Sequence, residues 1–230
     1  IVSVGEPQVY SATVTIPEDT EAGSYSFILK ITDYNEQSHV SSLTYTVTII
    51  QEYNITLKLQ SSTTEVDPGG NPIWSFMIEN RGNGADTITL SLTGVPESWN
   101  VELDSSNFEL ASRFPGQTSK VVTLSMVVPS NESSGQYNFE IIASSLGTSS
   151  SIVFNLTINA IYQVGVSEVG EAEKVGQPGK EVYFTFDSTN LGNSNDSFEL
   201  SASGTMISQS SSTTLTWSDI SKTSDILISI

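Results

Sequence analysis

The sequence predicts an all-β chain built from tandem antiparallel β-sandwich modules. Three observations lead to this prediction. Apolar and polar residues alternate almost throughout, which places one face of each strand on a core and the other in water. Glycine, proline, asparagine and serine divide the alternating stretches into short strands, and no stretch shows the apolar period of a helix. The order of strands and turns also repeats along the 230 residues.

The repeat is clearest around Pro17 and Pro129, where VTIPEDTEAGSYSF recurs as MVVPSNESSGQYNF at a constant spacing of 112 residues. The stretch that begins at Pro68 recurs at Pro178, at a spacing of 110. Halves of a module therefore alternate along the chain, which is the mark of a tandem array. We predict three units: the C-terminal half of a first module, a complete second module, and the N-terminal part of a third, at residues 1–51, 52–160 and 161–230.

Seven alternating stretches predict the strands of the second module, with Trp74 and Trp99 on its core stripes. The breaker between the first two of them is the turn-forming run Asp67–Pro72, with two prolines and two glycines. The seven stretches are Tyr53–Leu59, Trp74–Ile78, Ile88–Leu92, Trp99–Leu103, Val122–Val128, Tyr137–Ile141 and Ile152–Ile158.

The flanking units keep the same pattern of alternation. The strands predicted there are Tyr10–Ile16, Tyr25–Ile31, Leu43–Ile49, Val182–Phe186, Phe198–Leu200 and Ile226–Ile230. The junctions at 49–53 and 158–162 contain no glycine, proline or serine, so the array is predicted to be a stiff rod. We expect Tyr53 and Tyr162 to pack at the module interfaces; the alternative is that each belongs only to the core of its own module.

Composition and charge exclude several classes of function. Lys and Arg total 8 against 26 for Asp and Glu, a net charge of −18, which disfavours nucleic acid and anionic membranes as partners. There is no cysteine and one histidine, His39, so most nucleophile–base pairs and zinc sites are excluded. We predict no enzyme activity in this segment. No run of 18 apolar residues is present, so no transmembrane segment is predicted.

Two repeated motifs have a structural interpretation, and one of them also has a metal-binding alternative. The run Gly135-Gln136-Tyr137 and its copy at Tyr25 are typical of a tyrosine corner, in which the hydroxyl binds nearby backbone. The loop Asn80-x-Gly-Asn-x-x-Asp86 and its copy ending at Asp196 favour a polar turn. The alternative is a cation site, with Asp86 and Asp196 as calcium candidates; no other cofactor is indicated.

Four asparagines lie in Asn-x-Ser/Thr sequences and are candidates for N-glycosylation. They are Asn54, Asn131, Asn155 and Asn195.

The motif residues resemble two related groups of immunoglobulin-like (Ig-like) modules. These are the modules that accompany NPCBM-type carbohydrate-binding domains and the cell-adhesion-related (CARDB-like) modules of archaeal and bacterial surface proteins. The resemblance is carried by Val66, Pro68, Gly69, Phe76, Asn80, Gly82, Pro96, Trp99, Pro129, Gly135 and Tyr137. It implies an Ig-like sandwich in each module and a place in acidic archaeal cell-surface glycoproteins, including surface-layer (S-layer) and filament subunits.

These observations predict a structural segment of an extracellular, cell-surface repeat protein, whose partners are other copies of itself or neighbouring surface subunits. Glycans would be covalent attachments. The alternative is an accessory carbohydrate-binding or adhesion array of a secreted enzyme or adhesin. An exposed platform around Trp217 would support carbohydrate binding, and calcium at the junctions would support adhesion. The chain begins and ends at nearly the same phase of the repeat. We take this to indicate a longer repetitive polymer or, alternatively, half-modules that are completed by the next chain.

Overall fold

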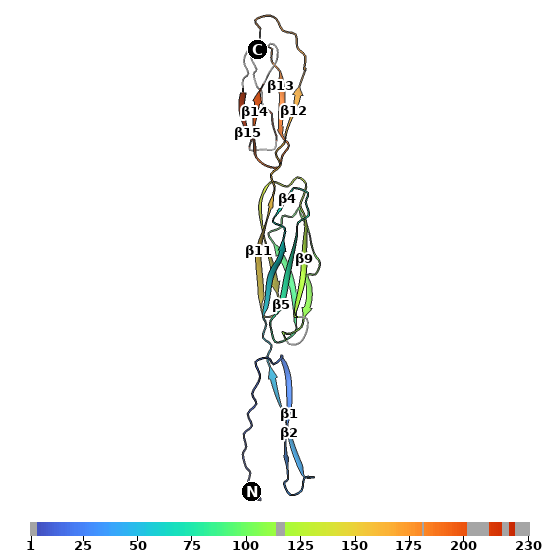
Figure 1. The fold of residues 1–230 in the computed structure, drawn as a ribbon, viewed down its shortest axis with the longest axis vertical. Coiled ribbons are helices and arrows are strands. Elements are labelled where there is room, and N and C mark those ends of the chain that lie inside the picture. Colours follow the sequence, from blue (N-terminus) through green and yellow to red (C-terminus); the bar gives the residue numbers. More distant parts are fainter. Residues whose placement is uncertain (1–3, 114–117, 181, 202–211, 218–220, 224–230) are drawn as a thin grey trace.

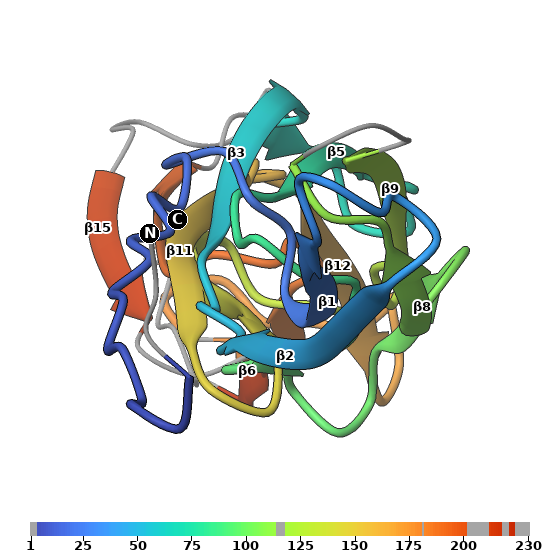
Figure 2. The same ribbon diagram turned by 90° about the horizontal axis from the view of Figure 1, so that it is seen from below.

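The computed structural model describes residues 4–113, 118–180, 182–201, 212–217 and 221–223. These residues form an elongated chain of three successive units, with the N-terminal unit at one end and the third unit at the other (Figure 1). Seen along the long axis, the strands of the three units project over one another (Figure 2). All regular elements in the described ranges are strands, and none of those residues forms a helix suited to crossing a membrane. The predicted all-β fold is confirmed.

The central unit is a sandwich of two sheets. One sheet has the strand order β4-β11-β10-β6-β8 and the other β3-β5-β9-β7. All pairs are antiparallel except β11 with β4. The strands are β3 (Ile55–Ser62), β4 (Glu65–Val66), β5 (Ile73–Asn80), β6 (Asp86–Thr93), β7 (Asn100–Leu103), β8 (Asn107–Leu110), β9 (Ser119–Val127), β10 (Gly135–Ser144) and β11 (Ser149–Ile158).

Aromatic side chains from both sheets meet in the core of this sandwich. Trp74 of β5 lies with its ring centroid 6.2 Å from that of Phe139 on β10 and 5.2 Å from that of Phe154 on β11. Phe76 lies 5.4 Å from Phe154, also across the sandwich. Trp74, Phe76 and Phe139 are almost completely buried, as the alternation of the sequence predicts. Tilted aromatic pairs of this kind stabilise a core beyond the area that they bury.

The seven predicted strands of the second module prove to be nine. The two additional strands, β4 and β8, have only two and four residues, too few for an alternating pattern to stand out. A second correction concerns the stretch from Trp99 to Leu103. Trp99 is buried, but Val101 is exposed, because Trp99 precedes β7 and turns into the core at the end of the sandwich.

The first unit consists of a hairpin and an extended segment. Strands β1 (Gly23–Thr32) and β2 (Val40–Ile49) pair antiparallel, with Phe27 stacked on Tyr45 at 5.4 Å. The strand predicted at Tyr10–Ile16 is absent: these residues are extended but unpaired, and Tyr10, Val14 and Ile16 are exposed. Its counterpart β9 is a strand because it pairs with β5 and β7, and the described residues place no such neighbours beside 10–16.

The third unit contains β12 (Val164–Val169), β13 (Thr185–Asn190), β14 (Asp196–Ser201), β15 (Ser212–Trp217) and β16 (Ser221–Thr223). They form a sheet of order β12-β13-β16 and a separate pair of β14 with β15. The strand predicted from Val182 begins only at Thr185, and the one predicted at 226–230 lies outside the described residues. Each sheet among the described residues lies within one predicted module, but the module boundaries themselves stay a prediction.

Candidate functional site at the module junctions

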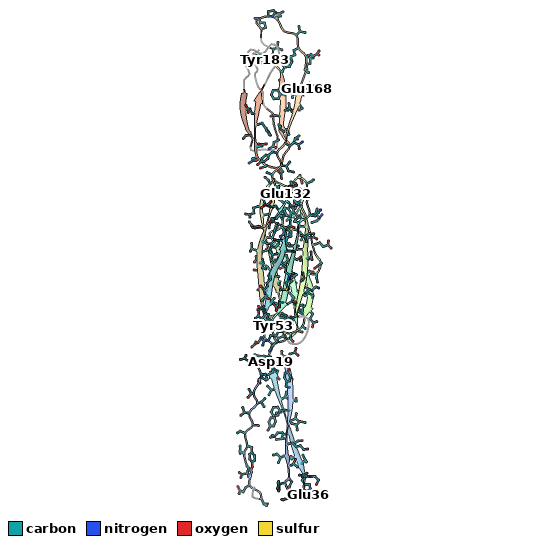
Figure 3. All side chains as sticks on the ribbon, viewed as in Figure 1. Asp19, Glu36, Tyr53, Glu132, Glu168 and Tyr183 are labelled. Carbon is teal, nitrogen blue, oxygen red and sulfur yellow. The ribbon has the colours of Figure 1, made fainter. Side chains whose placement is uncertain are left out.

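The most distinctive polar structure of this chain lies where one unit meets the next. The loop that joins β5 to β6 sits at the first junction, and the loop that joins β13 to β14 sits at the second. Both loops carry the repeated Asn-x-Gly-Asn motif, at residues 80–83 and 190–193. Figure 3 labels Tyr53 beside the first junction and Glu132 beside the second.

The first asparagine of each motif shapes its own loop. The Asn80 Oδ1 accepts a hydrogen bond from the Gly82 N–H at 2.8 Å, and its Nδ2 donates to the Gly84 carbonyl at 2.9 Å. Asn190 makes the same two bonds, from Gly192 N at 2.9 Å and to Ser194 O at 2.8 Å. Both asparagines are buried. An asparagine that bonds local backbone in this way holds a tight turn, so this part of the motif is the predicted polar turn.

The second asparagine of the first loop, Asn83, binds the linker and the preceding unit. Its Oδ1 accepts from the Glu52 N–H at 2.7 Å, and its Nδ2 donates to the Ile50 carbonyl at 3.1 Å. Its main chain adds a bond from Asn83 N to Glu52 O at 3.3 Å and one from Ala22 N to Asn83 O at 2.8 Å. Ala22 belongs to the first unit, so one buried residue of the second unit holds the linker and the unit before it.

Asn193 repeats this arrangement at the second junction. Its Oδ1 accepts from the Ile161 N–H at 2.7 Å, and its Nδ2 donates to the carbonyls of Asn159 at 3.0 Å and Glu132 at 3.1 Å. Its main-chain carbonyl accepts from Ser134 N at 2.9 Å. We call the pair Asn83 and Asn193, with these bonds, the asparagine clamps.

A glycine in each loop makes room for the clamp. A Cβ atom on Gly82 would collide with the Glu52 carbonyl oxygen, and one on Gly192 would collide with the Ile161 carbonyl oxygen. These carbonyls are the ones that accept from the main-chain N–H of Asn83 and Asn193. The glycines are therefore required by the close approach of two backbones.

Side chains of the second unit add further contacts at the first junction. The Arg113 guanidinium donates to the Glu18 carbonyl at 2.9 Å, and the Ser112 hydroxyl bonds to the Glu21 carboxylate. The Gln51 side-chain amide of the linker donates to the Ala85 carbonyl at 2.9 Å. The linker and both units are thus bonded together in several directions.

A cleft of about 690 Å³ lies between the second and third units. Its walls include Ser130 and Asn131 from the second unit and Leu191 and Asn195 from the third, with the linker residue Ile161 between them.

The wall of this cleft is connected to the core through Glu132. Its carboxylate accepts one hydrogen bond from the Trp99 indole N–H at 2.7 Å and another from the Tyr137 hydroxyl at 2.7 Å. Burial raises the pKa of Tyr137 most, followed by its hydrogen bond to Glu132 and the negative charge of Glu132. Together they raise this pKa from 10.0 to about 12. The main-chain carbonyl of Glu132 is also the one that Asn193 binds.

The hydroxyls of the tyrosines predicted as corners lie at equivalent backbone carbonyls, although Tyr137 shares its one proton with Glu132. The Tyr137 hydroxyl lies 3.0 Å from the Ser133 carbonyl, and the Tyr25 hydroxyl lies 3.0 Å from the Glu21 carbonyl. In each case the acceptor is four residues upstream, on the loop that faces the next unit. The corners therefore hold the loops that contact Asn83 and Asn193.

The two calcium candidates lie apart from other acids. Asp86 is buried, and its Oδ2 has no hydrogen-bond partner among the described residues. Asp196 accepts a bond from the Ser197 N–H at 2.7 Å. In the described ranges no three His, Cys, Asp or Glu side chains gather around a common point, so neither Asp86 nor Asp196 has a set of partners with which to share an ion.

The glycosylation candidates Asn54, Asn131, Asn155 and Asn195 are all exposed. Asn54 precedes β3, Asn131 lies in the turn before β10, Asn155 is on β11 and Asn195 precedes β14. Asn131 and Asn195 come from different units and line the same cleft.

The expectation for the junction tyrosines is wrong. Tyr162 is 64% exposed, and Tyr53 packs against Gly147 in the turn between β10 and β11 of its own module. The residues that bind the units together are Asn83 and Asn193, which the sequence analysis placed only in a turn. Their repetition, together with that of the glycine before them, was the available signal.

No protein-family model and no curated protein matches the chain. The resemblance to CARDB-like and NPCBM-associated modules therefore stays a prediction.

Solved structures similar to the chain include three of different kinds. A family 123 glycoside hydrolase from Clostridium perfringens is 9% identical over 46% of this chain and 27% of that one, with a TM-score of 0.38. Domains 4–9 of the surface layer protein SbsC are 11% identical over 84% of this chain and 31% of that one, with a TM-score of 0.32. The E. coli chaperone DraB is 12% identical over 71% of this chain and 86% of that one, with a TM-score of 0.31. The chain thus spans about a third or less of the first two, and at these scores the likenesses say nothing about function.

Proposed function

We propose that this chain is a structural segment of an extracellular, cell-surface repeat protein of the surface-layer, stalk or filament kind. In this role the units act as a stiff spacer between other parts of the surface, and no reaction is catalysed within the segment. The partners are neighbouring subunits or further copies of the same protein.

The observation that supports the proposal is the asparagine clamp, in which at both junctions the Oδ1 accepts from a linker N–H and the Nδ2 donates to a linker carbonyl. Neighbouring domains move relative to each other unless something holds them. An asparagine whose side chain bonds the linker backbone, and whose main-chain carbonyl accepts a bond from the preceding unit, opposes this motion. Stiffness in a tandem array is useful where distance must be kept, as in a stalk or lattice.

The bulk properties of the chain support the same role. A net charge of −18 keeps a long array soluble and prevents units from collapsing onto one another. The absence of cysteine leaves the fold independent of redox conditions.

An accessory carbohydrate-binding array needs exposed aromatic rings on one face. Trp74 and Trp99 are buried in the central core and do not serve this purpose. The side chain of Trp217 lies outside the described residues.

Stiffness is tested by distance measurements across the junctions. Because the chain has no cysteine, pairs of cysteines can be introduced at exposed sites and spin-labelled without competing reactions. The pairs are Thr46 and Thr87 across the first junction and Gln136 and Ser167 across the second. We expect narrow distance distributions in the parent chain, and clearly broader ones when Asn83→Ala and Asn193→Ala remove the clamps. Broad distributions in the parent chain would overturn the proposal.

A matched control separates the clamp from a general effect of losing an asparagine. Asn35 is exposed and lies in the loop between β1 and β2, at the end of the first unit that is remote from both junctions (Figure 3 labels the neighbouring Glu36), so Asn35→Ala should leave both distributions unchanged. Circular dichroism of each variant checks that the sandwich is still folded. Labelling of intact cells with a membrane-impermeant reagent tests the location, and absence of label on this segment would contradict a surface role.

A further inference from the structure

We propose that Asn131 and Asn195 carry N-linked glycans, and that these two glycans occupy the cleft between the second and third units. This modification goes beyond the structural role, and it assigns a use to the cleft at the second junction. The argument rests on the amides and the cleft.

The asparagines of this chain fall into two groups by what their side-chain amides do. Those that hold the loops and junctions donate through Nδ2 to protein acceptors: Asn80, Asn83, Asn107, Asn159, Asn190 and Asn193. None of these lies in an Asn-x-Ser/Thr sequence. The four that do are exposed, and no hydrogen bond of their amides to another described residue is found. Their amide nitrogens are therefore available for a covalent bond.

Among these four, only Asn131 and Asn195 face a cleft that suits a saccharide. Hydroxyl and amide groups of Ser130, Thr189 and Gln163 line it, together with the apolar surfaces of Ile161 and Leu191. Sugars present hydroxyl groups at their edges and C–H groups on their ring faces, so a wall with both kinds of group fits them. A volume of about 690 Å³ accommodates the proximal sugars of two chains.

The counterparts of Asn131 and Asn195 at the first junction are Asp19 and Ala85, which cannot be N-glycosylated. Figure 3 shows Asp19 at this junction. At these two positions, therefore, only the second junction has acceptor sequences for glycans.

The two remaining candidates lie in regular structure. Asn155 and its Thr157 are both in β11, and the Thr157 N–H bonds to Thr64 O at 2.8 Å. The Asn54 carbonyl accepts from Arg81 N at 2.7 Å at the start of β3. Asn131 lies in a turn and Asn195 just before a strand, where the acceptor sequence can enter a transferase site more easily.

The chemistry is a glycosyl transfer from a lipid-phosphate-linked saccharide. The asparagine Nδ2 forms a bond to the anomeric carbon of the sugar, and it loses one proton. The bond from that carbon to the phosphate oxygen breaks, and the lipid phosphate leaves with the electron pair. No oxidant or reductant is needed, and the amide stays an amide.

The first test is mass spectrometry of peptides from the full protein, isolated from its own cells. We expect the peptides that contain Asn131 and Asn195 to be heavier by whole monosaccharide units. Ser133→Ala and Ser197→Ala should abolish the modification at the respective asparagine, whereas Ser133→Thr and Ser197→Thr, which keep the acceptor sequence, should preserve it. An unmodified Asn131 or Asn195 in the isolated protein would refute the inference.

The second test asks where the glycans lie. Spin labels at Gln136 and Ser167 report on the second junction, and we compare glycosylated protein with the same chain made in bacteria that lack the transferase. Asn131→Gln with Asn195→Gln should broaden the distances in glycosylated protein and leave the unglycosylated chain unchanged. Asn155→Gln is the matched control. Equal distributions with and without glycans would show that the sugars point away from the cleft, against this inference. The clamp variants are measured on unglycosylated protein, so their outcome is independent of this one.

Discussion

Asn83 and Asn193 each use both the oxygen and the nitrogen of the side-chain amide to bind the junction. The amide has one acceptor and one two-hydrogen donor, and it can therefore imitate a peptide group. Each clamp pairs with the N–H and a carbonyl of the linker, so the linker backbone is satisfied as if it lay beside another strand. A shorter or charged side chain cannot make both bonds at once.

Replacing the glycine beside a clamp should be as harmful as replacing the asparagine. In Gly82→Ala the new methyl group meets the Glu52 carbonyl oxygen, so the linker must move away and the bonds of Asn83 lengthen. Loss of these buried bonds costs about 1–3 kcal/mol. Hydrogen exchange of the Glu52 amide should accelerate, while Thr87→Ala on the exposed face of β6 serves as the control. An unchanged exchange rate at Glu52 would contradict the close approach.

The Glu132 carboxylate predicts a specific dependence on high pH. The pKa of Tyr137 is raised to about 12 in the folded chain, whereas an unfolded tyrosine has a pKa of 10.0. Between these values the unfolded state releases a proton that the folded state keeps, so the free energy of unfolding falls as pH rises from about 10 to about 12. Tyr137→Phe should remove this contribution in urea titrations at several pH values. Glu132→Gln should lower the pKa of Tyr137 in an ultraviolet titration; an unchanged pKa would show that Glu132 has no part in the shift.

The hairpin is the element in which sequence and structure agree best. Strands β10 and β11 pair over their whole length, and the same register occurs between β1 and β2. Alternation is a local property of a strand, and the short loop of a hairpin places the next strand of the chain beside it. By contrast, residues 10–16 have the alternation of a strand and no strand beside them, so they remain unpaired. Strand propensity without a partner does not produce a sheet.

The core of the central sandwich is held by β5, β10 and β11 together. Phe139 on β10 is 1% exposed and lies within 6.2 Å, between ring centroids, of Trp74, Trp99 and Phe154. Phe139→Ala should lower the free energy of unfolding by about 3–5 kcal/mol because it leaves a cavity. Chemical denaturation measures this change. Val153→Ala, at a side chain that is 69% exposed on β11, is the control and should change it little.

At the scale of the whole molecule, charge and junctions act together. The chain carries −18 charges at pH 7, and ion pairs among the described residues are few and exposed. Repulsion within and between units therefore dominates its surface electrostatics. The clamps must hold neighbouring units together against this repulsion.

Added salt should accordingly stabilise the chain. Between about 0.01 M and 1 M salt the screening length falls from about 30 Å to about 3 Å, which removes most of the repulsion. We expect the midpoint of urea unfolding to rise with sodium chloride and to level off at high concentration. A midpoint that falls would mean that exposed ion pairs contribute more to stability than repulsion costs.

Much of the fold was predictable from the sequence, and the clamp was not. The alternation around Trp74, Phe76 and Phe139 predicts which side chains are buried, because a strand has two faces whatever lies beyond it. The repeat predicts units of about 110 residues because segments of similar sequence adopt similar folds. Strands β4 and β8 were missed because a short pairing depends on its neighbours more than on its own residues.

By itself, then, the sequence determined the all-β fold, the core stripes and the repetition of the Asn-x-Gly-Asn loop. Only the tertiary structure decided what that loop does. Its first asparagine closes a turn within one unit, while its second binds a linker and a unit that lie more than 20 residues away along the chain. Local periodicity describes how a segment meets its own core. The contact of Asn83 with Glu52 and Ala22 depends on how two folded units pack against each other, and no local sequence pattern specifies that packing.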